Sequence, residues 1–132
     1  MPPPYKNLVL ADDDEDDLEL FAEAVVETYP DLQVTVATDG AKLIKLLAKI
    51  PTPDVILIDL NMPRKSGKEC LEEIRANDEF NKVPIIILST SDDKADIDYC
   101  LKRGADNYYV KPYSFEGMKN IIVNICSGSF DR

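Results

Sequence analysis

Five short apolar runs, rich in β-branched residues and separated by segments of helical spacing, constrain the fold of this chain more than any other feature. The runs cover residues 7–11, 32–37, 54–59, 84–89 and 107–110. Strands that alternate with helices are typical of a parallel sheet in which a helix follows each strand. The sequence therefore predicts an α/β fold, a three-layer, doubly wound (βα)5 sandwich around a five-stranded parallel sheet with right-handed crossovers.

The apolar patterns also predict positions within this fold. The runs 54–59 and 84–89 are apolar nearly throughout, as central parallel strands are, whereas 32–37 alternates and suits an edge. Ser114 is the predicted N-cap of the last helix and Gly104 the residue after the end of the preceding one. Five helical stripes are predicted to face the core: Leu18, Phe21, Ala22, Val25 and Tyr29; Leu43, Leu46, Leu47 and Ile50; Cys70, Leu71 and Ile74; Ile97, Cys100 and Leu101; and Phe115, Met118, Ile122, Ile125 and Cys126.

Length and charge limit the functions that the chain can have. Its 132 residues suffice for one hydrophobic core, so we expect a single domain over 1–132 with its core at about 5–126. The net charge of -10 repels polyanions, which argues against nucleic acid as a partner. No apolar run approaches the ~20 residues of a membrane span, and the first residues lack a signal-peptide pattern, so we expect a cytoplasmic protein without a membrane partner.

The cysteine and histidine content excludes several kinds of site. The three cysteines, Cys70, Cys100 and Cys126, are widely spaced within apolar patterns, which favours buried thiols over a disulfide or metal site. The chain has no histidine, so histidine-based catalysis and histidine-ligated zinc are excluded.

Polar residues stand where four of the predicted strands end. Asp12 and Asp13 follow the first run, Asp59 and Ser89 end the third and fourth, and Lys111 follows the fifth. In an open parallel sheet these carboxyl ends form the ligand-binding edge. Carboxylates so close together repel one another unless a cation neutralises them, and a hard divalent cation such as Mg²⁺ prefers oxygen ligands. The sequence therefore predicts a magnesium site beside a lysine.

The acidic run continues beyond this pair to Asp17. The carboxylates of residues 14–17 are predicted to cap and stabilise the N-terminus of the first helix. Asp12, Asp14, Asp16 and Glu23 also have the spacing of an EF-hand loop, but its required glycine is replaced and a strand, not a helix, precedes the loop. The EF-hand interpretation is therefore disfavoured.

Together these motifs closely resemble the receiver domains of bacterial two-component response regulators, the CheY-like family. "VLADD" resembles the acidic pair of that family, "ILIDLNMP" its phospho-acceptor strand, "IIILSTS" its hydroxyl strand and "NYYVKP" its lysine–proline turn, in the same order and spacing over nearly the whole chain. The resemblance implies a flavodoxin-like sheet of order 2-1-3-4-5. The loops look most like those of stand-alone receivers, including those that work with phytochrome-type kinases.

The resemblance also implies roles for single residues. Asp59 corresponds to the carboxylate that accepts a phosphoryl group, Asp13 to a direct Mg²⁺ ligand, Asp12 to a water-mediated one, and Asn61 supplies a backbone carbonyl. Lys111 corresponds to the residue that holds the acyl phosphate, and its bond to Pro112 is expected to be cis. Ser89 corresponds to the hydroxyl that binds the new phosphoryl group, and Tyr108 to the aromatic switch.

The implied function is that of a signalling module rather than an enzyme: it takes a phosphoryl group from a histidine kinase or phosphotransfer protein and changes its affinity for an unknown downstream protein. Homodimerisation through the fourth helix, fifth strand and fifth helix is a further expectation. A phosphatase of the haloacid dehalogenase type is the alternative, because it also uses a strand-end aspartate, a hydroxyl and a lysine with Mg²⁺. A flavodoxin-like electron carrier is disfavoured, because carboxylates occupy the place of its phosphate loop.

Overall fold

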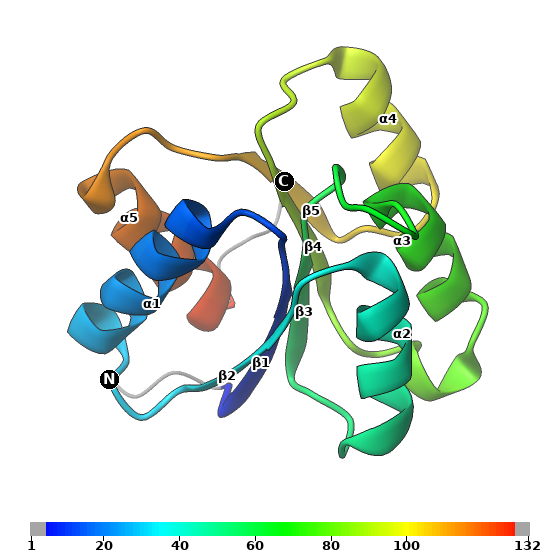
Figure 1. Ribbon diagram of the computed structural model, residues 1–132, viewed down its shortest axis with the longest axis horizontal. Coiled ribbons are helices and arrows are strands. Elements are labelled where there is room, and N and C mark those ends of the chain that lie inside the picture. Colours follow the sequence, from blue (N-terminus) through cyan, green and yellow to red (C-terminus); the bar gives the residue numbers. More distant parts are fainter. Residues whose placement is uncertain (1–4, 129–132) are drawn as a thin grey trace.

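The computed structural model describes residues 5–128 as one parallel five-stranded sheet between two layers of helices (Figure 1). The strand order is β2-β1-β3-β4-β5. The elements are β1 (Asn7–Ala11), α1 (Glu15–Thr28), β2 (Gln33–Ala37), α2 (Gly40–Lys49), β3 (Val55–Ile58), α3 (Gly67–Arg75), the 3₁₀ turn η1 (Asp78–Phe80), β4 (Ile85–Ser89), α4 (Lys94–Lys102), β5 (Asn107–Val110) and α5 (Phe115–Cys126). The predicted fold class and strand order are confirmed, and β2 lies at an edge.

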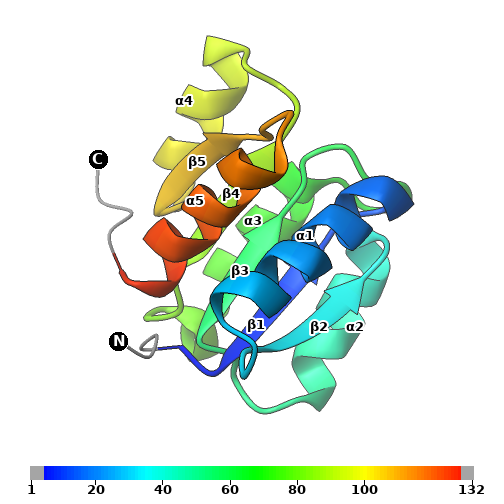
Figure 2. The same ribbon diagram turned by 90° about the vertical axis from the view of Figure 1, so that its left-hand side faces the viewer.

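The two helical layers cover opposite faces of the sheet. Figure 2 shows α1 and α5 side by side on one face, and α2, α3 and α4 cover the other. Successive residues of a strand point to opposite faces, so Leu8 and Leu10 of β1 pack beneath α1 and α5 while Val9 and Ala11 pack toward α2 and α3. The central strands β3 and β4 are buried throughout, as their apolar sequences predict.

Local capping explains where several helices begin and end. Asp14 is the N-cap of α1, and its Oδ1 accepts hydrogen bonds from the backbone N–H groups of Asp16 (3.0 Å) and Asp17 (3.1 Å). Ser114 caps α5 as predicted, and Gly104 follows the end of α4 with φ +109°, a conformation that glycine adopts most readily.

One residue of the stripe predicted for α1 is wrong. Phe21, Ala24 and Val25 are the buried residues of α1, whereas Ala22, which the sequence pattern assigned to the core, is exposed. Alanine is small enough to lie on either border of an apolar face that is more than 100° wide, so the pattern alone did not distinguish the two. The three cysteines are free and buried, as expected, and burial raises the pKa of each thiol to about 11.

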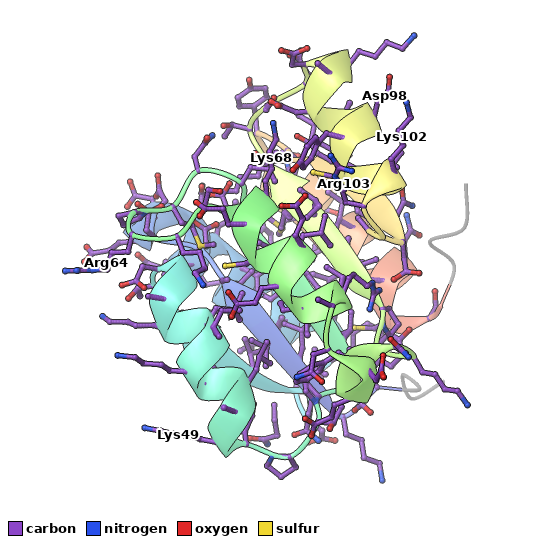
Figure 3. All side chains as sticks on the ribbon, turned by 90° about the vertical axis from the view of Figure 1, so that its right-hand side faces the viewer. Lys49, Arg64, Lys68, Asp98, Lys102 and Arg103 are labelled. Carbon is purple, nitrogen blue, oxygen red and sulfur yellow. The ribbon has the colours of Figure 1, made fainter. Side chains whose placement is uncertain are left out.

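Charged side chains join α3 to α4 on the outer surface of one layer (Figure 3). Lys68 Nζ lies 4.8 Å and Arg103 Cζ 4.6 Å from the ring centroid of Tyr99, whose hydroxyl donates to Glu72 Oε1 at 2.8 Å. Lys68 Nζ also pairs with Asp96 Oδ1 at 2.7 Å. These contacts hold α4 against α3 from its first turn to its C-cap.

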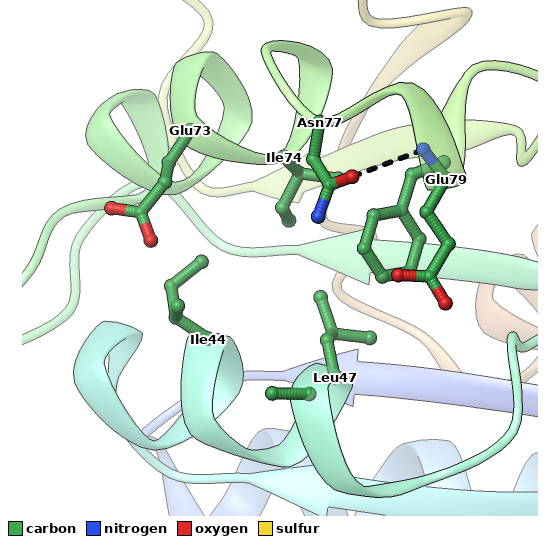
Figure 4. A pocket seen from close by; sticks show the side chains of 8 residues that line it. Ile44, Leu47, Glu73, Ile74, Asn77 and Glu79 are labelled. Carbon is green, nitrogen blue, oxygen red and sulfur yellow. Dashed lines mark hydrogen bonds between the residues drawn. The ribbon is translucent and has the colours of Figure 1, made fainter.

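A hollow of about 250 Å³ lies between α2 and α3 (Figure 4). Apolar side chains such as Ile44, Leu47 and Ile74 line it, together with Asn77 and Glu79 near η1. Because η1 leads into the start of β4, this hollow lies toward the amino ends of the strands, away from the edge where the sequence places the charged residues. None of the helices within residues 5–128 is long and apolar enough to cross a membrane.

Candidate functional site

The carboxyl ends of three strands deliver charged residues to one edge of the sheet. Asp12 follows β1, Asp59 follows β3 and Lys111 follows β5. Their backbone N–H groups extend the parallel ladder: Asp12 N donates to the last residue of β2 (3.0 Å), Asp59 N to that of β1 (2.9 Å) and Lys111 N to that of β4 (2.8 Å). The sheet therefore fixes the backbone from which these side chains project.

Asp12, Asp13 and Asp59 form a cluster of the kind that holds a metal ion. Each offers a carboxylate oxygen, and these three atoms lie within 4.8 Å of one another. Asp12 and Asp59 are buried, whereas Asp13 is exposed at the mouth. Asn61 lies beside the cluster and its backbone N–H donates to Asp59 Oδ1 at 3.3 Å. The arrangement suits a divalent cation with oxygen ligands that remains open to water on one side.

Lys111 supplies positive charge to the same cluster. Its ammonium lies 2.8 Å from Asp12 Oδ2 and 3.1 Å from Asp59 Oδ2, and its side chain is only 6% exposed. A third carboxylate, Asp17 Oδ2 from the first turn of α1, lies 2.6 Å away. The lysine is therefore enclosed by carboxylates from α1 and from the ends of two strands.

Burial and charge shift the acid–base behaviour of the cluster. Burial raises the pKa of Asp12 to about 6, although hydrogen bonds from Lys111 and from the backbone N–H of Asp14 lower it in part. Burial alone would also disfavour the Lys111 ammonium, but hydrogen bonds to Asp12 and Asp17 and the charge of Asp59 outweigh it and raise the pKa of Lys111. The lysine is thus a cation at neutral pH, and the raised pKa of Asp12 reflects chiefly the cost of burying its charge, with a smaller contribution from the charge of Asp59.

The close approach of α3 confines the loop after Asp59. A Cβ atom on Gly67 would lie 2.3 Å from the carbonyl oxygen of Asp59, so only glycine allows the helix to begin here. Gly67 N also donates to Leu60 O at 3.0 Å, and Ser66 caps α3 through a reciprocal pair of hydrogen bonds with Glu69.

Ser89 and Tyr108 lie next to the cluster rather than within it. Ser89, the last residue of β4, is fully buried, and its Oγ accepts a hydrogen bond from Ser91 N at 3.3 Å. Tyr108 is half-buried on β5, and its hydroxyl donates to the carbonyl oxygen of Ser91 at 2.7 Å. The neighbouring Tyr109 packs into the opposite layer with α1 and α5. Both predicted switch residues therefore contact the β4–α4 loop.

Two sequence-based expectations need correction. The peptide bond between Lys111 and Pro112 is trans, since residues 5–128 contain no cis bond, and with this bond the lysine still reaches Asp12 and Asp59. Asp17, which the sequence analysis treated only as a helix-stabilising charge, contacts Lys111 directly. Acidic residues in a first turn are common, and the one that faces inward could be found only from the helix rotation.

Comparison with known proteins identifies the family. The response regulator receiver domain matches residues 8–123. The chain is a response regulator receiver domain. It belongs to a family of phospho-acceptor signalling modules, and the acidic cluster with Lys111 is the receiver pocket of that family. The haloacid dehalogenase alternative is therefore wrong.

Individual relatives differ in how much of their length the receiver domain covers. It is 27% identical over 128 residues to the response regulator Rcp1 of Synechocystis sp., a match that covers 92% of this chain and 87% of Rcp1. It is 34% identical over 119 residues to the sensor histidine kinase TmoS of Ectopseudomonas mendocina, covering 90% of this chain but only 12% of TmoS. The chain therefore corresponds to only a small part of that larger protein.

Solved receiver structures superpose closely on this one. The Mn²⁺-bound form of Rcp1 gives a TM-score of 0.85 at 26% identity and covers 92% of this chain and 94% of its own. The phosphorylated cyanobacterial phytochrome response regulator RcpA gives 0.84 at 29% identity, with coverages of 92% and 91%. These neighbours confirm the CheY-like arrangement of the sheet and helices.

Proposed function

We propose that Asp59 accepts a phosphoryl group from a histidine kinase or a histidine phosphotransfer protein in the presence of Mg²⁺. The observation that carries this proposal is the position of Lys111 Nζ, 3.1 Å from Asp59 Oδ2 at the rim of a carboxylate cluster that spans no more than 4.8 Å. Two neighbours support it, because TmoS is a sensor histidine kinase and RcpA was crystallised in a phosphorylated form.

The cluster suits Mg²⁺ because it offers carboxylate oxygens, the ligands that this ion prefers. Burial raises the pKa of Asp12 to about 6 and the charge of Asp59 adds to this effect, so a cation placed between them would relieve an existing repulsion. Asp12, Asp13, Asp59 and the backbone carbonyl of Asn61 would hold the ion. When bound, Mg²⁺ would neutralise charge on the oxygens of the phosphoryl group. The Mn²⁺-bound form of Rcp1 supports a divalent ion.

The residues of this chain then position the transfer. A carboxylate oxygen of Asp59 attacks the phosphorus of a phosphohistidine; the new O–P bond forms as the P–N bond breaks, and its electron pair stays on the imidazole nitrogen. Lys111 and the Ser89 hydroxyl hold oxygens of the transferred group. Positioning and charge, rather than proton transfer, account for most of the rate in this kind of reaction.

Intact-mass measurement tests the acceptor. With Mg²⁺ and a small phosphodonor such as acetyl phosphate, the wild-type protein should gain one phosphoryl group and the Asp59→Asn variant none. Asp92→Asn removes an exposed carboxylate of the β4–α4 loop and serves as the matched control, which should be labelled like the wild type. Labelling of Asp59→Asn at the wild-type level would contradict the assignment.

We propose that phosphorylation is transmitted through Ser89 and Tyr108 to the face formed by α4, β5 and α5. A chain of contacts already joins β5 to α4: the Tyr108 hydroxyl donates to Ser91 O, and the Ser91 hydroxyl donates to Asp96 Oδ2 in the first turn of α4 at 2.6 Å. Movement of Ser89 toward the phosphoryl group would change the loop that Tyr108 contacts. The ligand biases the equilibrium only by contacts that are better in one state.

Amide hydrogen exchange tests this switch. The Tyr108→Ala variant should still be phosphorylated on Asp59, but the change in exchange over residues 90–126 that a beryllofluoride mimic induces in the wild type should be largely lost. Tyr109→Ala is the control: its ring packs with α1 and α5, so it should reduce stability and keep the response. An identical exchange pattern with and without the mimic in the wild type would remove the role of Tyr108.

The rest of the proposal concerns the setting of the domain. We place residues 1–132 in the cytoplasm as one receiver domain, whose output is the binding of a downstream protein or a second copy of the chain. Exposed apolar side chains on the α4–β5–α5 side, including Val110 at the end of β5, suit such a contact. Nucleic acid and membrane surfaces are not proposed as partners, because a net charge of -10 repels both phosphate backbones and anionic lipids.

A further inference from the structure

The ammonium group of Lys111 has no free donor in this structure. It carries three N–H groups, and three carboxylates lie within hydrogen-bonding distance: Asp17 at 2.6 Å, Asp12 at 2.8 Å and Asp59 at 3.1 Å. For Lys111 to hold an oxygen of a phosphoryl group on Asp59, at least one of these contacts has to be released.

The three partners are not equivalent. Asp12 and Asp59 belong to the group of oxygens that can hold a cation, whereas Asp17 does not. A divalent cation on that group would repel the ammonium and compete with it for the same two carboxylates. Asp17 is therefore the partner that Lys111 can keep when the cluster binds a metal.

The first turn of α1 holds Asp17 in place for this contact. Its backbone N–H donates to the N-cap side chain of Asp14 at 3.1 Å, and its carboxylate faces Lys111 across 94 positions of the chain. The adjacent Asp16 has the same charge in the same helical turn, but its side chain is exposed to solvent. Favourable charge at the helix N-terminus explains both residues, but it does not explain the inward contact of Asp17.

We propose that Asp17 is a positioning residue, which keeps the Lys111 ammonium at the rim of the pocket when the cation occupies the strand-end carboxylates. With the metal bound, Lys111 retains Asp17 and has two N–H groups left for the phosphoryl oxygens. Without Asp17, the lysine has only Asp12 and Asp59 as partners and competes with the cation for them. This inference rests on the proposed phosphorylation of Asp59.

The test compares Asp17→Ala with Asp16→Ala, which removes the same charge one residue away. Asp17→Ala should weaken Mg²⁺ binding in calorimetric titration, and at saturating Mg²⁺ should slow phosphorylation by acetyl phosphate about tenfold, roughly the effect of losing one well-placed charge-assisted hydrogen bond. Asp16→Ala should change both quantities less than twofold. Asp17→Asn, which keeps an acceptor oxygen without the charge, should give an intermediate rate. Equal effects of the two alanine variants would overturn the proposal.

A double-mutant cycle shows whether Asp17 acts through the lysine. In a Lys111→Met background, Asp17→Ala should have no further effect on the phosphorylation rate or on Mg²⁺ affinity, whereas a purely structural or long-range role of Asp17 would persist. A persistent effect, with the wild type still labelled on Asp59, overturns the role of Asp17 and leaves the proposed function intact. Labelling of Asp59→Asn would instead overturn the proposed function.

Discussion

Replacing Arg75 by alanine is expected to lower the free energy of unfolding by roughly 2–4 kcal/mol, because several acceptors would lose a charged donor at once. The guanidinium at the end of α3 donates to the carbonyl oxygens of Gly104 (2.8 Å), Phe80 (2.8 Å) and Val83 (3.0 Å), and to Asp106 Oδ2 (2.9 Å). These acceptors belong to two separate connections, the one before β4 and the one before β5.

The geometry of the guanidinium explains why lysine can replace Arg75 only in part. Arginine presents its donors as a planar fork, whereas lysine offers a single point charge, so Arg75→Lys should recover only part of the loss. Asp106 Oδ2 also accepts from Ile85 N at 2.8 Å, and loss of Arg75 would therefore weaken the first residue of β4 as well. Urea denaturation measures the effect from the midpoint and its slope.

Arg103→Ala provides the matched control for this prediction. Arg103 is half-exposed, pairs with the carboxylate of Glu72 at 3.0 Å and lies over the Tyr99 ring, and such exposed contacts are weak, so its removal should cost only about 1 kcal/mol. The Arg75 variant should still be phosphorylated at temperatures where it is folded, because its contacts lie far from Asp59. Equal unfolding midpoints for the two variants would contradict the role given to the Arg75 contacts.

Asp13→Ala is expected to weaken Mg²⁺ binding at least ~10-fold, since loss of even an indirect partner of a metal site often costs that much. The carboxylate of Asp13 is the exposed member of the three-oxygen cluster. In the absence of metal the same substitution should stabilise the fold by up to about 1 kcal/mol, because it relieves repulsion with Asp12 and Asp59.

This prediction is demanding because one substitution is expected both to weaken Mg²⁺ binding and to stabilise the metal-free fold. Calorimetric titration measures the affinity, and thermal unfolding followed by circular dichroism, with EDTA and with excess Mg²⁺, measures the stability; the chain has no tryptophan to report by fluorescence. Asp16→Ala is the control, because Asp16 lies outside the cluster. If Asp13→Ala retained wild-type affinity while Asp16→Ala lost it, the EF-hand interpretation would replace the strand-end site.

Regular patterns made most of the fold predictable from the sequence. A strand that is buried on both faces is apolar at nearly every position, and such a continuous run predicts the bounds of β3 and β4 to within one residue. The sequence pattern places Asp54 in the third strand, but Asp54 precedes β3, and its carboxylate accepts hydrogen bonds from the backbone N–H groups of Lys6 (2.7 Å) and Asn7 (2.8 Å) where β1 begins. A side chain that binds backbone N–H groups of another segment leaves no periodic pattern in the sequence, so this contact could not be predicted.

The site was predictable where topology alone fixes it. Parallel strands bring their carboxyl ends to one edge, so Asp12, Asp59 and Lys111 could be placed on the same edge once the strands were identified. Asp17 was missed because its contact depends on how α1 is rotated over the sheet, the same rotation that buries Ala24 rather than Ala22. The rotation is set by packing against α5, which lies at the other end of the sequence.

The Arg75 contacts lie at the amino ends of the strands, and the charged pocket lies at the carboxyl ends. Substitutions more than about 10 Å apart that share no partners usually have additive effects on stability. Changes in the loops around Asp59 and Ser89 can therefore be combined with changes around Arg75 with little interference. In practical terms the sheet separates two design problems: one end can be altered to tune the lifetime of a phosphoryl group, and the other can be reinforced to restore any stability lost.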